Sequence, residues 1–274
     1  MKFHSDKNQF FIRYLLTQIK LALDMKKYML FSLLLFFAFS CTTYFPVVDT
    51  ATTNISVSES VAGENPELLE LLKPYKQELE ADMSRVLAIS DVEMIKNKPE
   101  SNMTNFMADM LLEEGREYCK KNNLELPVVA YVNYGGIRST LPKGEINVQK
   151  VFELMPFENT MALLKISGEK FRKMADIIAE REGDGVAGMK LGIKNKTVSS
   201  LLVGGEKLEA GKSYWIVTND YVANGGDNMV MFTDPESFIS TETSIRDIII
   251  RHMENKTKRG QHISAQTDGR IFYE

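Results

Sequence analysis

The chain has 274 residues, a formal net charge of −4 and two cysteines. This mild negative charge, without any block of lysines or arginines, argues against a nucleic-acid polymer as the ligand. With 44% hydrophobic residues, the part that follows the leader is long enough for one well-cored domain.

The first feature along the chain is an apolar run over residues 28–39, which has the length of a signal peptide. It is too short to span a bilayer as a permanent helix, and Lys26 and Lys27 precede it as a basic region. We expect residues 1–40 to be a signal-peptide region, with Met25 as a candidate for the true start. Residues 1–24 are then either upstream sequence translated by mistake or an unusual extension.

The residues before Cys41 are small and resemble the lipobox of bacterial lipoproteins, so we expect Cys41 to be lipidated. The alternative is a buried cysteine after an apolar helix. The first interpretation predicts an exported lipoprotein of the bacterial cell envelope, anchored to a membrane and facing the periplasm or the cell surface. A lipidated Cys41 leaves no partner for an intramolecular disulfide, and Cys119 is expected to be a semi-buried helix residue.

Residues 41–65 are rich in Thr, Ser and Val, which predicts a tether with a short strand at residues 55–60. Pro66 opens a helix over residues 66–88, where apolar residues recur with a spacing near 3.6 and where Pro74 kinks or splits the helix. A second helix is predicted over residues 101–123.

A buried strand over residues 126–133 and a loop over residues 134–139 follow. Further along, the pattern predicts a short strand and helical turn at 146–155, a strand at 160–168, an amphipathic helix at 168–182, strands at 186–194, 196–205 and 213–219, and a last helix at 243–256. This mixture predicts a mixed α/β fold with α+β layers, in which residues 66–274 form a single domain.

The chain has three histidines, His4, His252 and His262, and no motif that places histidines and carboxylates together as metal ligands. It also has no G-x-S-x-G sequence and no Walker loop. We therefore do not expect a self-contained hydrolase of a common type, and we expect no cofactor in this chain.

Three loops carry residues suited to binding a nucleotide. After the strand that ends near residue 132, Asn133 can donate and accept hydrogen bonds, and Arg138 can bind an anion bidentately. Phe157 follows a proline in a turn, and the stretch TNDYVANGGD supplies Tyr221 and Asp227. Two aromatic faces, an amide, an arginine and an aspartate suit a base, a ribose and a phosphate.

Each of these residues also has a plainer interpretation. TNDYVANGGD is compatible with a hairpin turn in which Tyr221 is a half-buried core residue. A single aromatic residue such as Phe157 is more often part of the core than of a binding site. The recurrence of such loops favours binding.

Four motifs in this order, SN-x-x-N-F-x-x-D, VNYGGIR, MPFENT and TNDYVANGGD, resemble the C-terminal, substrate-binding domain of the 5′-nucleotidase family. The resemblance covers roughly residues 66–274. Tyr134 departs from the family's run of three glycines, and Tyr221 stands where the family usually has Phe.

The resemblance implies a role for each matching residue. Phe157 and Tyr221 would enclose the base, Asn133 would contact it, and Asp227 would hold the ribose hydroxyls. Arg138 would bind phosphate, joined by Arg116.

Full-length members of the family carry an N-terminal metallophosphatase domain, which is not expected in this chain. The resemblance therefore implies the nucleotide-recognition half of a split 5′-nucleotidase, which binds nucleoside 5′-phosphates while a separate metallophosphatase protein supplies divalent metals for hydrolysis in nucleotide catabolism. The alternatives are a non-catalytic lipoprotein that binds nucleosides or nucleotides, and a degenerate domain kept as an interaction module.

Overall fold

The computed structural model describes residues 65–274 and, nearer the N-terminus, residues 16, 20, 25, 26 and 29. The predicted apolar core of the signal peptide, Cys41 and the predicted strand at residues 55–60 lie outside the described residues. Among the helices described, none is long and apolar enough to cross a membrane. Residues Asn65–Glu274 form one compact unit.

A five-stranded mixed sheet forms the centre of this unit. Its strands are, in spatial order, β10 (Ser237–Ser244), β4 (Thr160–Ser167), β9 (Ser213–Asn219), β2 (Val129–Val132) and β5 (Gly185–Ala187). β2 and β9 run parallel, whereas the other neighbouring pairs are antiparallel. The central strand β9 is therefore paired on both edges, and it is rich in the β-branched and aromatic residues that favour strands.

Successive residues of the central strands point to opposite faces of the sheet and enter two separate hydrophobic clusters. Val217 of β9 belongs to the first cluster, and its neighbour Ile216 belongs to the second. Leu163 and Leu164 of β4 are divided in the same way. This period of two shows that the sheet is buried on both faces.

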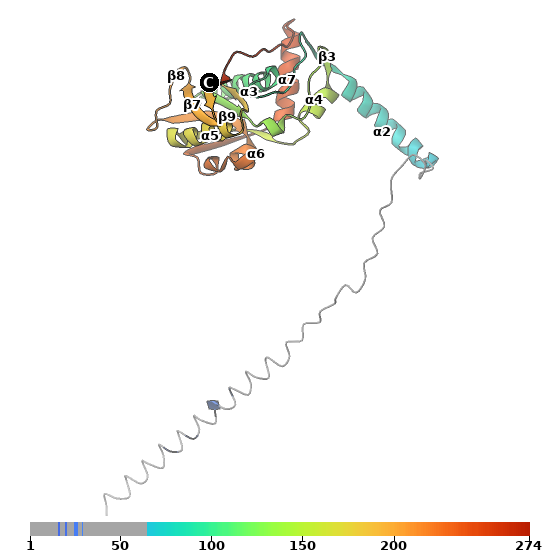
Figure 1. Cartoon of the computed structure of the whole chain (residues 1–274). Helices are drawn as coiled ribbons and strands as arrows, with labels where there is room; N and C mark the ends of the chain where they lie inside the picture. Colours follow the sequence, from blue (N-terminus) through green and yellow to red (C-terminus); the bar gives the residue numbers. More distant parts are fainter. Residues whose placement is uncertain (1–15, 17–19, 21–24, 27–28, 30–64) are drawn as a thin grey trace, which may run out of the picture. The chain divides into compact units, whose positions relative to one another are not determined.

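Helices cover one face of the sheet, and a helix together with a second sheet covers the other. The first cluster includes residues of α3 (Asn102–Lys121), α4 (Val148–Leu154) and α7 (Ile245–Lys258), whereas α5 (Gly168–Glu180) contributes to the second. Figure 1 shows α5 on the opposite side of β9 from α3. α3 begins at a capping box in which Ser101 and Thr104 each accept a hydrogen bond from the other's backbone N–H.

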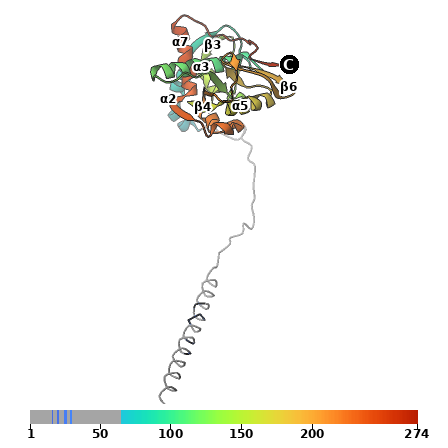
Figure 2. The same cartoon turned by 90° about the vertical axis from the view of Figure 1, so that its left-hand side faces the viewer.

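The second sheet has the order β11 (Ile271–Tyr273), β6 (Met189–Lys194), β7 (Thr197–Val203) and β8 (Glu206–Lys207). β11 pairs in parallel with β6, so the C-terminus lies beside β6 (Figure 2). A two-stranded sheet joins β1 (Val86–Ser90) to β3 (Gly144–Asn147). The mixed α/β class predicted from the sequence is confirmed.

The main difference from the prediction lies at the start of the domain. The helix predicted over residues 66–88 ends earlier, as α2 (Pro66–Ser84), and continues through Pro74 as one helix. The residues after Arg85 pair with β3, because Val86 and Ile89 suit a strand better than a helix. Cys119, expected to be semi-buried, is completely buried in α3.

Candidate functional site

The three loops singled out in the sequence meet at one edge of the central sheet. The first follows β2, and the third follows β9 through α6 (Asp220–Ala223). Because β2 and β9 are parallel, their carboxyl ends lie at the same edge. β4 runs antiparallel to β9, so the second loop, which precedes β4, reaches that edge as well.

A pocket of about 350 Å³ lies among these loops. Five of the six substrate-binding residues predicted from the sequence line it, together with two glycines and Asn159. The lining residues are Asn133, Gly135, Gly136, Arg138, Phe157, Asn159, Tyr221 and Asp227.

The Asp227 carboxylate is held by two side chains in this pocket. Asn133 Nδ2 donates to Oδ2 at 2.6 Å, and the Tyr221 hydroxyl donates to Oδ1 at 3.2 Å. The same hydroxyl accepts a hydrogen bond from the Asp227 backbone N–H at 3.2 Å. Since an ionised carboxylate has about four acceptor sites, further hydroxyl donors can still bind to it.

The glycine before Asp227 allows Tyr221 to lie against the turn. A Cβ at Gly226 would sit 2.5 Å from Cε1 of the Tyr221 ring and 2.5 Å from its carbonyl oxygen. Real Cβ contacts are not that short, so a larger residue at this position would push the Tyr221 ring away. The second glycine of TNDYVANGGD, Gly226, thus leaves room for the Tyr221 ring beside Asp227.

Asn133 connects the first and third loops beneath the pocket. Asn133 is 4% exposed, and its Oδ1 accepts a hydrogen bond of 3.2 Å from Asn219 Nδ2 at the end of β9. A Cβ at Gly136 would lie 2.8 Å from this Oδ1, so the glycine leaves room for the amide. The amide of Asn133 is therefore fixed against Asp227, while its predicted contact with a base stays a prediction.

The two aromatic residues are exposed at the pocket. Phe157 is 39% exposed and Tyr221 is 46% exposed, whereas the large aromatic residues of the core, such as Phe171 and Phe232, are completely buried. The hairpin-turn interpretation of TNDYVANGGD is wrong, because β9 leads into α6 rather than into a returning strand.

Cationic side chains gather on one side of the first loop. Lys96 Nζ donates to the carbonyls of Tyr134 and Ile137, at 3.1 and 2.6 Å. It lies 4.1 Å from the centre of the Tyr134 ring, and Lys98 Nζ lies 5.1 Å from it. Burial first, and then the charges of Arg138 and Lys98, lower the pKa of Lys96, which indicates that the three cations share one positive region.

Arg116, the sixth predicted binding residue, does not reach this pocket. Its Nε donates to the carbonyl of Pro127, which precedes β2, whereas the pocket lies where β2 ends. The match along α3 had suggested a partner for Arg138. The structure instead places Lys96 and Lys98 near Arg138. In the sequence, both lysines lie shortly before the SN-x-x-N-F motif, and this position is the pattern that could have marked them as pocket residues.

Two further residues touch the pocket loops from behind, and the sequence did not single them out. Asp184 is 3% exposed and accepts hydrogen bonds from the Tyr134 backbone N–H at 2.8 Å and the Tyr131 hydroxyl at 3.1 Å. Arg181 Nη1 lies 3.6 Å from the Asp184 carboxylate, and the same guanidinium donates to the backbone carbonyl of Asp227. No local pattern marks these residues, because their partners are distant in sequence.

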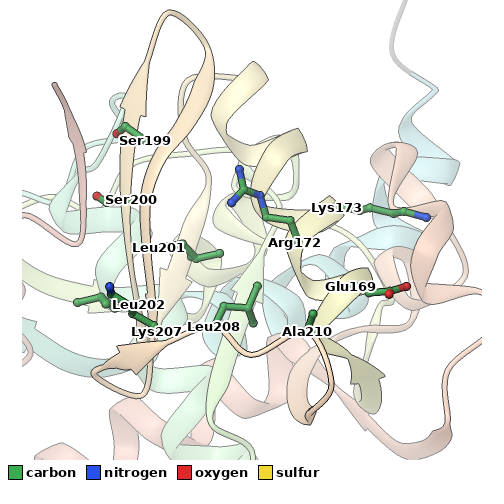
Figure 3. A pocket seen from close by; sticks show the side chains of 11 residues that line it. Glu169, Arg172, Lys173, Ser199, Ser200, Leu201, Leu202, Lys207, Leu208 and Ala210 are labelled. Carbon is green, nitrogen blue, oxygen red and sulfur yellow. The ribbon is translucent and has the colours of Figure 1, made fainter.

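A second cleft of about 750 Å³ lies between α5 and the β7–β8 hairpin (Figure 3). Leu201 points towards α5, and Arg172 projects into the cleft from that helix. Its lining contains serines, leucines and charged residues but no aromatic side chain. It therefore offers no aromatic face on which a base can stack, and the motif loops do not contribute to it.

Within residues 65–274 and the few described positions before them, no group of three or more His, Cys, Asp or Glu side chains is arranged to hold a metal ion. In the pocket itself Asp227 is the carboxylate among the lining residues.

Comparison with known proteins identifies the domain family to which the chain belongs. Residues 84–234 match the family model described as "5'-nucleotidase, C-terminal domain". The chain is 29% identical over 249 residues to the trifunctional nucleotide phosphoesterase protein YfkN of Bacillus subtilis, covering 82% of this chain and 16% of that protein. It is 23% identical over 206 residues to a 5′-nucleotidase of Vibrio vulnificus, covering 73% of this chain and 36% of the relative.

Among solved structures, the 5′-nucleotidase precursor of Thermus thermophilus has the same fold over 74% of this chain, with a TM-score of 0.64 and 24% identity. The match covers 42% of that chain. This chain thus spans less than half the length of these relatives.

Proposed function

Because the chain belongs to the family of 5′-nucleotidase C-terminal domains, we propose that its pocket binds nucleoside 5′-phosphates and nucleosides. One observation carries this proposal: two exposed aromatic side chains, Phe157 and Tyr221, line the same pocket as the Asp227 carboxylate. Aromatic faces suit a base, and a carboxylate suits the vicinal hydroxyls of a ribose.

The side chains that line the pocket suggest where the base and the ribose of the nucleotide bind. The base lies against Phe157 and Tyr221, and the ribose hydroxyls bind the carboxylate that Asn133 and Tyr221 orient. Because the Asn133 amide is engaged below Asp227, the side chain of Asn159, which follows Phe157 by two residues, is better placed to contact the edge of the base.

The phosphate lies towards Arg138. Its guanidinium lines the pocket, and Lys96 and Lys98 add positive charge beside it. Arginine binds phosphate oxygens bidentately, while lysine acts as a point charge. Arg116 has no part in this assignment, because it lies beyond the opposite end of β2.

In hydrolysis the domain supplies recognition. A separate metallophosphatase polypeptide supplies the divalent metals and the attacking water, and binding energy gathered on base and ribose places the phosphate at those metals. The residues of this chain bind and orient the nucleotide, and the separate polypeptide carries out the hydrolysis.

Calorimetric titration of the purified protein with nucleosides and nucleoside 5′-monophosphates tests the binding. Saturable binding of both classes is expected, with tighter binding of the phosphorylated one. Absence of binding to either class would overturn the proposal. Phosphate release from AMP, assayed with Mn²⁺, Mg²⁺ or Zn²⁺, should require addition of a metallophosphatase. Turnover that persists through repurification of this chain alone would contradict the division of labour.

Attachment to a membrane through a lipidated Cys41 is part of the same proposal, and it rests on the residues that precede Cys41 in the sequence. Cys41→Ser should move the protein from the membrane fraction to the soluble fraction. Membrane association that is unchanged, with the leader still present by mass spectrometry, would favour an uncleaved anchor.

A further inference from the structure

The turn that carries Asp227 has a backbone conformation that needs support. Asp227 and Asn228 have φ values of 51° and 58°, in the left-handed region. Residues with a Cβ adopt that region at a cost in free energy, and they keep it when surrounding contacts hold them there. The backbone N–H of Asp227 is bound by Tyr221, and its carbonyl is bound by Arg181.

Arg181 is itself held from two directions. Its guanidinium lies 3.6 Å from the Asp184 carboxylate, and its backbone carbonyl accepts a hydrogen bond from Lys98 Nζ. Its side chain is 26% exposed, against 2% for the side chain of Asp184. A buried carboxylate beside a guanidinium fixes the position of the cation more firmly than a solvated pair does.

Asp184 extends the contact to the first pocket loop. Its Oδ1 accepts the backbone N–H of Tyr134, at the start of the turn that leads to Arg138. The short segment after α5 therefore touches both loops: Asp184 holds the loop that carries Arg138, and Arg181 holds the turn that carries Asp227.

We propose that Arg181 and Asp184 are positioning residues that clamp these two loops together and so hold the Asp227 carboxylate in the orientation that binds a ribose. This role rests on the proposed function for its ligand. Neither side chain touches the nucleotide. They contribute mainly to the affinity for ligands that carry sugar hydroxyls, because the turn that they hold is the one that carries Asp227.

The test compares Arg181→Gln and Asp184→Asn with a matched control, Arg172→Gln. Arg172 lies on the preceding helix and pairs with Asp176 at 3.0 Å, facing the other cleft (Figure 3). Affinity for adenosine and for 2′,3′-dideoxyadenosine is measured by calorimetry for each variant, together with the melting temperature. Hydrogen exchange is followed in the peptide over residues 222–232, with the α3 peptide as reference.

Both clamp variants should weaken adenosine binding by roughly tenfold or more, as expected for losing a hydrogen bond to a charged group, and dideoxyadenosine binding by less than about threefold. Exchange in residues 222–232 should become roughly tenfold faster while the α3 peptide is unchanged. Arg172→Gln should alter none of these quantities. Should Arg181→Gln fail to fold, Arg181→Lys, which keeps a cation near Asp184, should show the same selective loss to a smaller extent.

Equal weakening of both ligands in parallel with the melting temperature would overturn the clamp and leave a purely structural role. Unchanged exchange in residues 222–232 would also overturn it. If the wild-type protein binds neither nucleoside, the proposed function fails, and the exchange measurement alone decides whether Arg181 and Asp184 hold the turn.

Discussion

The Tyr221 hydroxyl and Asp227 hold each other, because Oη lies 3.2 Å from the Asp227 Oδ1 and 3.2 Å from its backbone nitrogen. The side chain at position 221 therefore has two separable contributions, a ring face and a hydroxyl. Tyr221→Phe should weaken binding of a ribonucleoside by about 0.5–1.5 kcal/mol, the usual value of one hydrogen bond, and affect a dideoxynucleoside less. Tyr221→Ala should cost both ligands about 1–3 kcal/mol, because stacking on the base is lost.

Calorimetry with both ligands on both variants separates the two contributions. The assignment of the ring to the base would be contradicted if Tyr221→Ala bound both nucleosides like the wild type while remaining folded.

Phe157 should behave as a binding residue and not as a core residue. Phe157→Ala should lower nucleoside affinity by about 1–3 kcal/mol through lost stacking, with a small change in melting temperature, because the side chain is 39% exposed. Phe238→Ala is a matched control, since Phe238 is 49% exposed but lies on β10 outside the pocket. A fall in melting temperature of several degrees for Phe157→Ala, with affinity following it, would instead identify a structural residue.

Substitution of the two arginines predicted to bind phosphate, Arg138 and Arg116, should have different effects on nucleotide affinity, because Arg138 alone of the two lines the pocket. Arg138→Ala should weaken binding of AMP by about 1.5–3 kcal/mol, the value of hydrogen bonds to a charged group, and leave adenosine nearly unaffected. Arg116→Ala should change neither affinity, because its guanidinium is bound to the Pro127 carbonyl. Titration of both variants with AMP and adenosine checks this, and an equal loss for both arginines would contradict the site as described.

Acid stability should depend on Glu114 of α3. Burial alone would raise its pKa, but two neighbours outweigh burial and lower it: His252, whose Nδ1 lies 3.8 Å from the carboxylate, and Arg251, which donates a hydrogen bond to it at 2.7 Å. A carboxyl group with a lowered folded pKa stabilises the protein fully above its unfolded pKa of about 4.3, and this stabilisation is lost as the pH falls through the folded pKa.

Glu114→Gln should therefore destabilise the protein at pH 7 by about 1–2 kcal/mol and have a smaller effect near pH 3. The effect is modest because the side chain of Arg251 is half exposed, and solvent screens its charge. Urea denaturation at the two pH values measures it, with Glu113→Gln as the control, since the side chain of Glu113 is 44% exposed. An equal loss of stability at both pH values would rule out the ionised Glu114 as the cause.

Sequence reasoning predicted the parts of the fold that have strong local patterns. The helix capped by Ser101, the strand containing Trp215 and the three motif loops are in place because capping, β-propensity and glycine pairs act locally. The strand β10 was missed because SFISTETS is polar and lies at a sheet edge, where hydrophobic alternation is weak.

The sequence predicted residues of this pocket where they lie within a motif, as for Asp227 and Phe157. Arg181 and Asp184 could not be found in this way, because their partners Asp227 and Tyr134 lie 46 and 50 positions away along the chain. Arg116 could not be placed from the sequence, because the packing of α3 on the sheet decides which end of β2 its side chain reaches. In the structure it reaches Pro127, before the strand begins.

The most direct test of the account is the affinity of wild type and Asp227→Ala for adenosine and 2′,3′-dideoxyadenosine, measured by calorimetry on protein whose melting temperature is checked in parallel. Asp227→Ala should lose adenosine affinity by about 1.5–3 kcal/mol, because the ribose hydroxyls lose a charged acceptor, and should then bind the two nucleosides almost equally. If the folded variant still distinguishes adenosine from dideoxyadenosine as the wild type does, Asp227 does not bind the ribose and the pocket has been assigned wrongly.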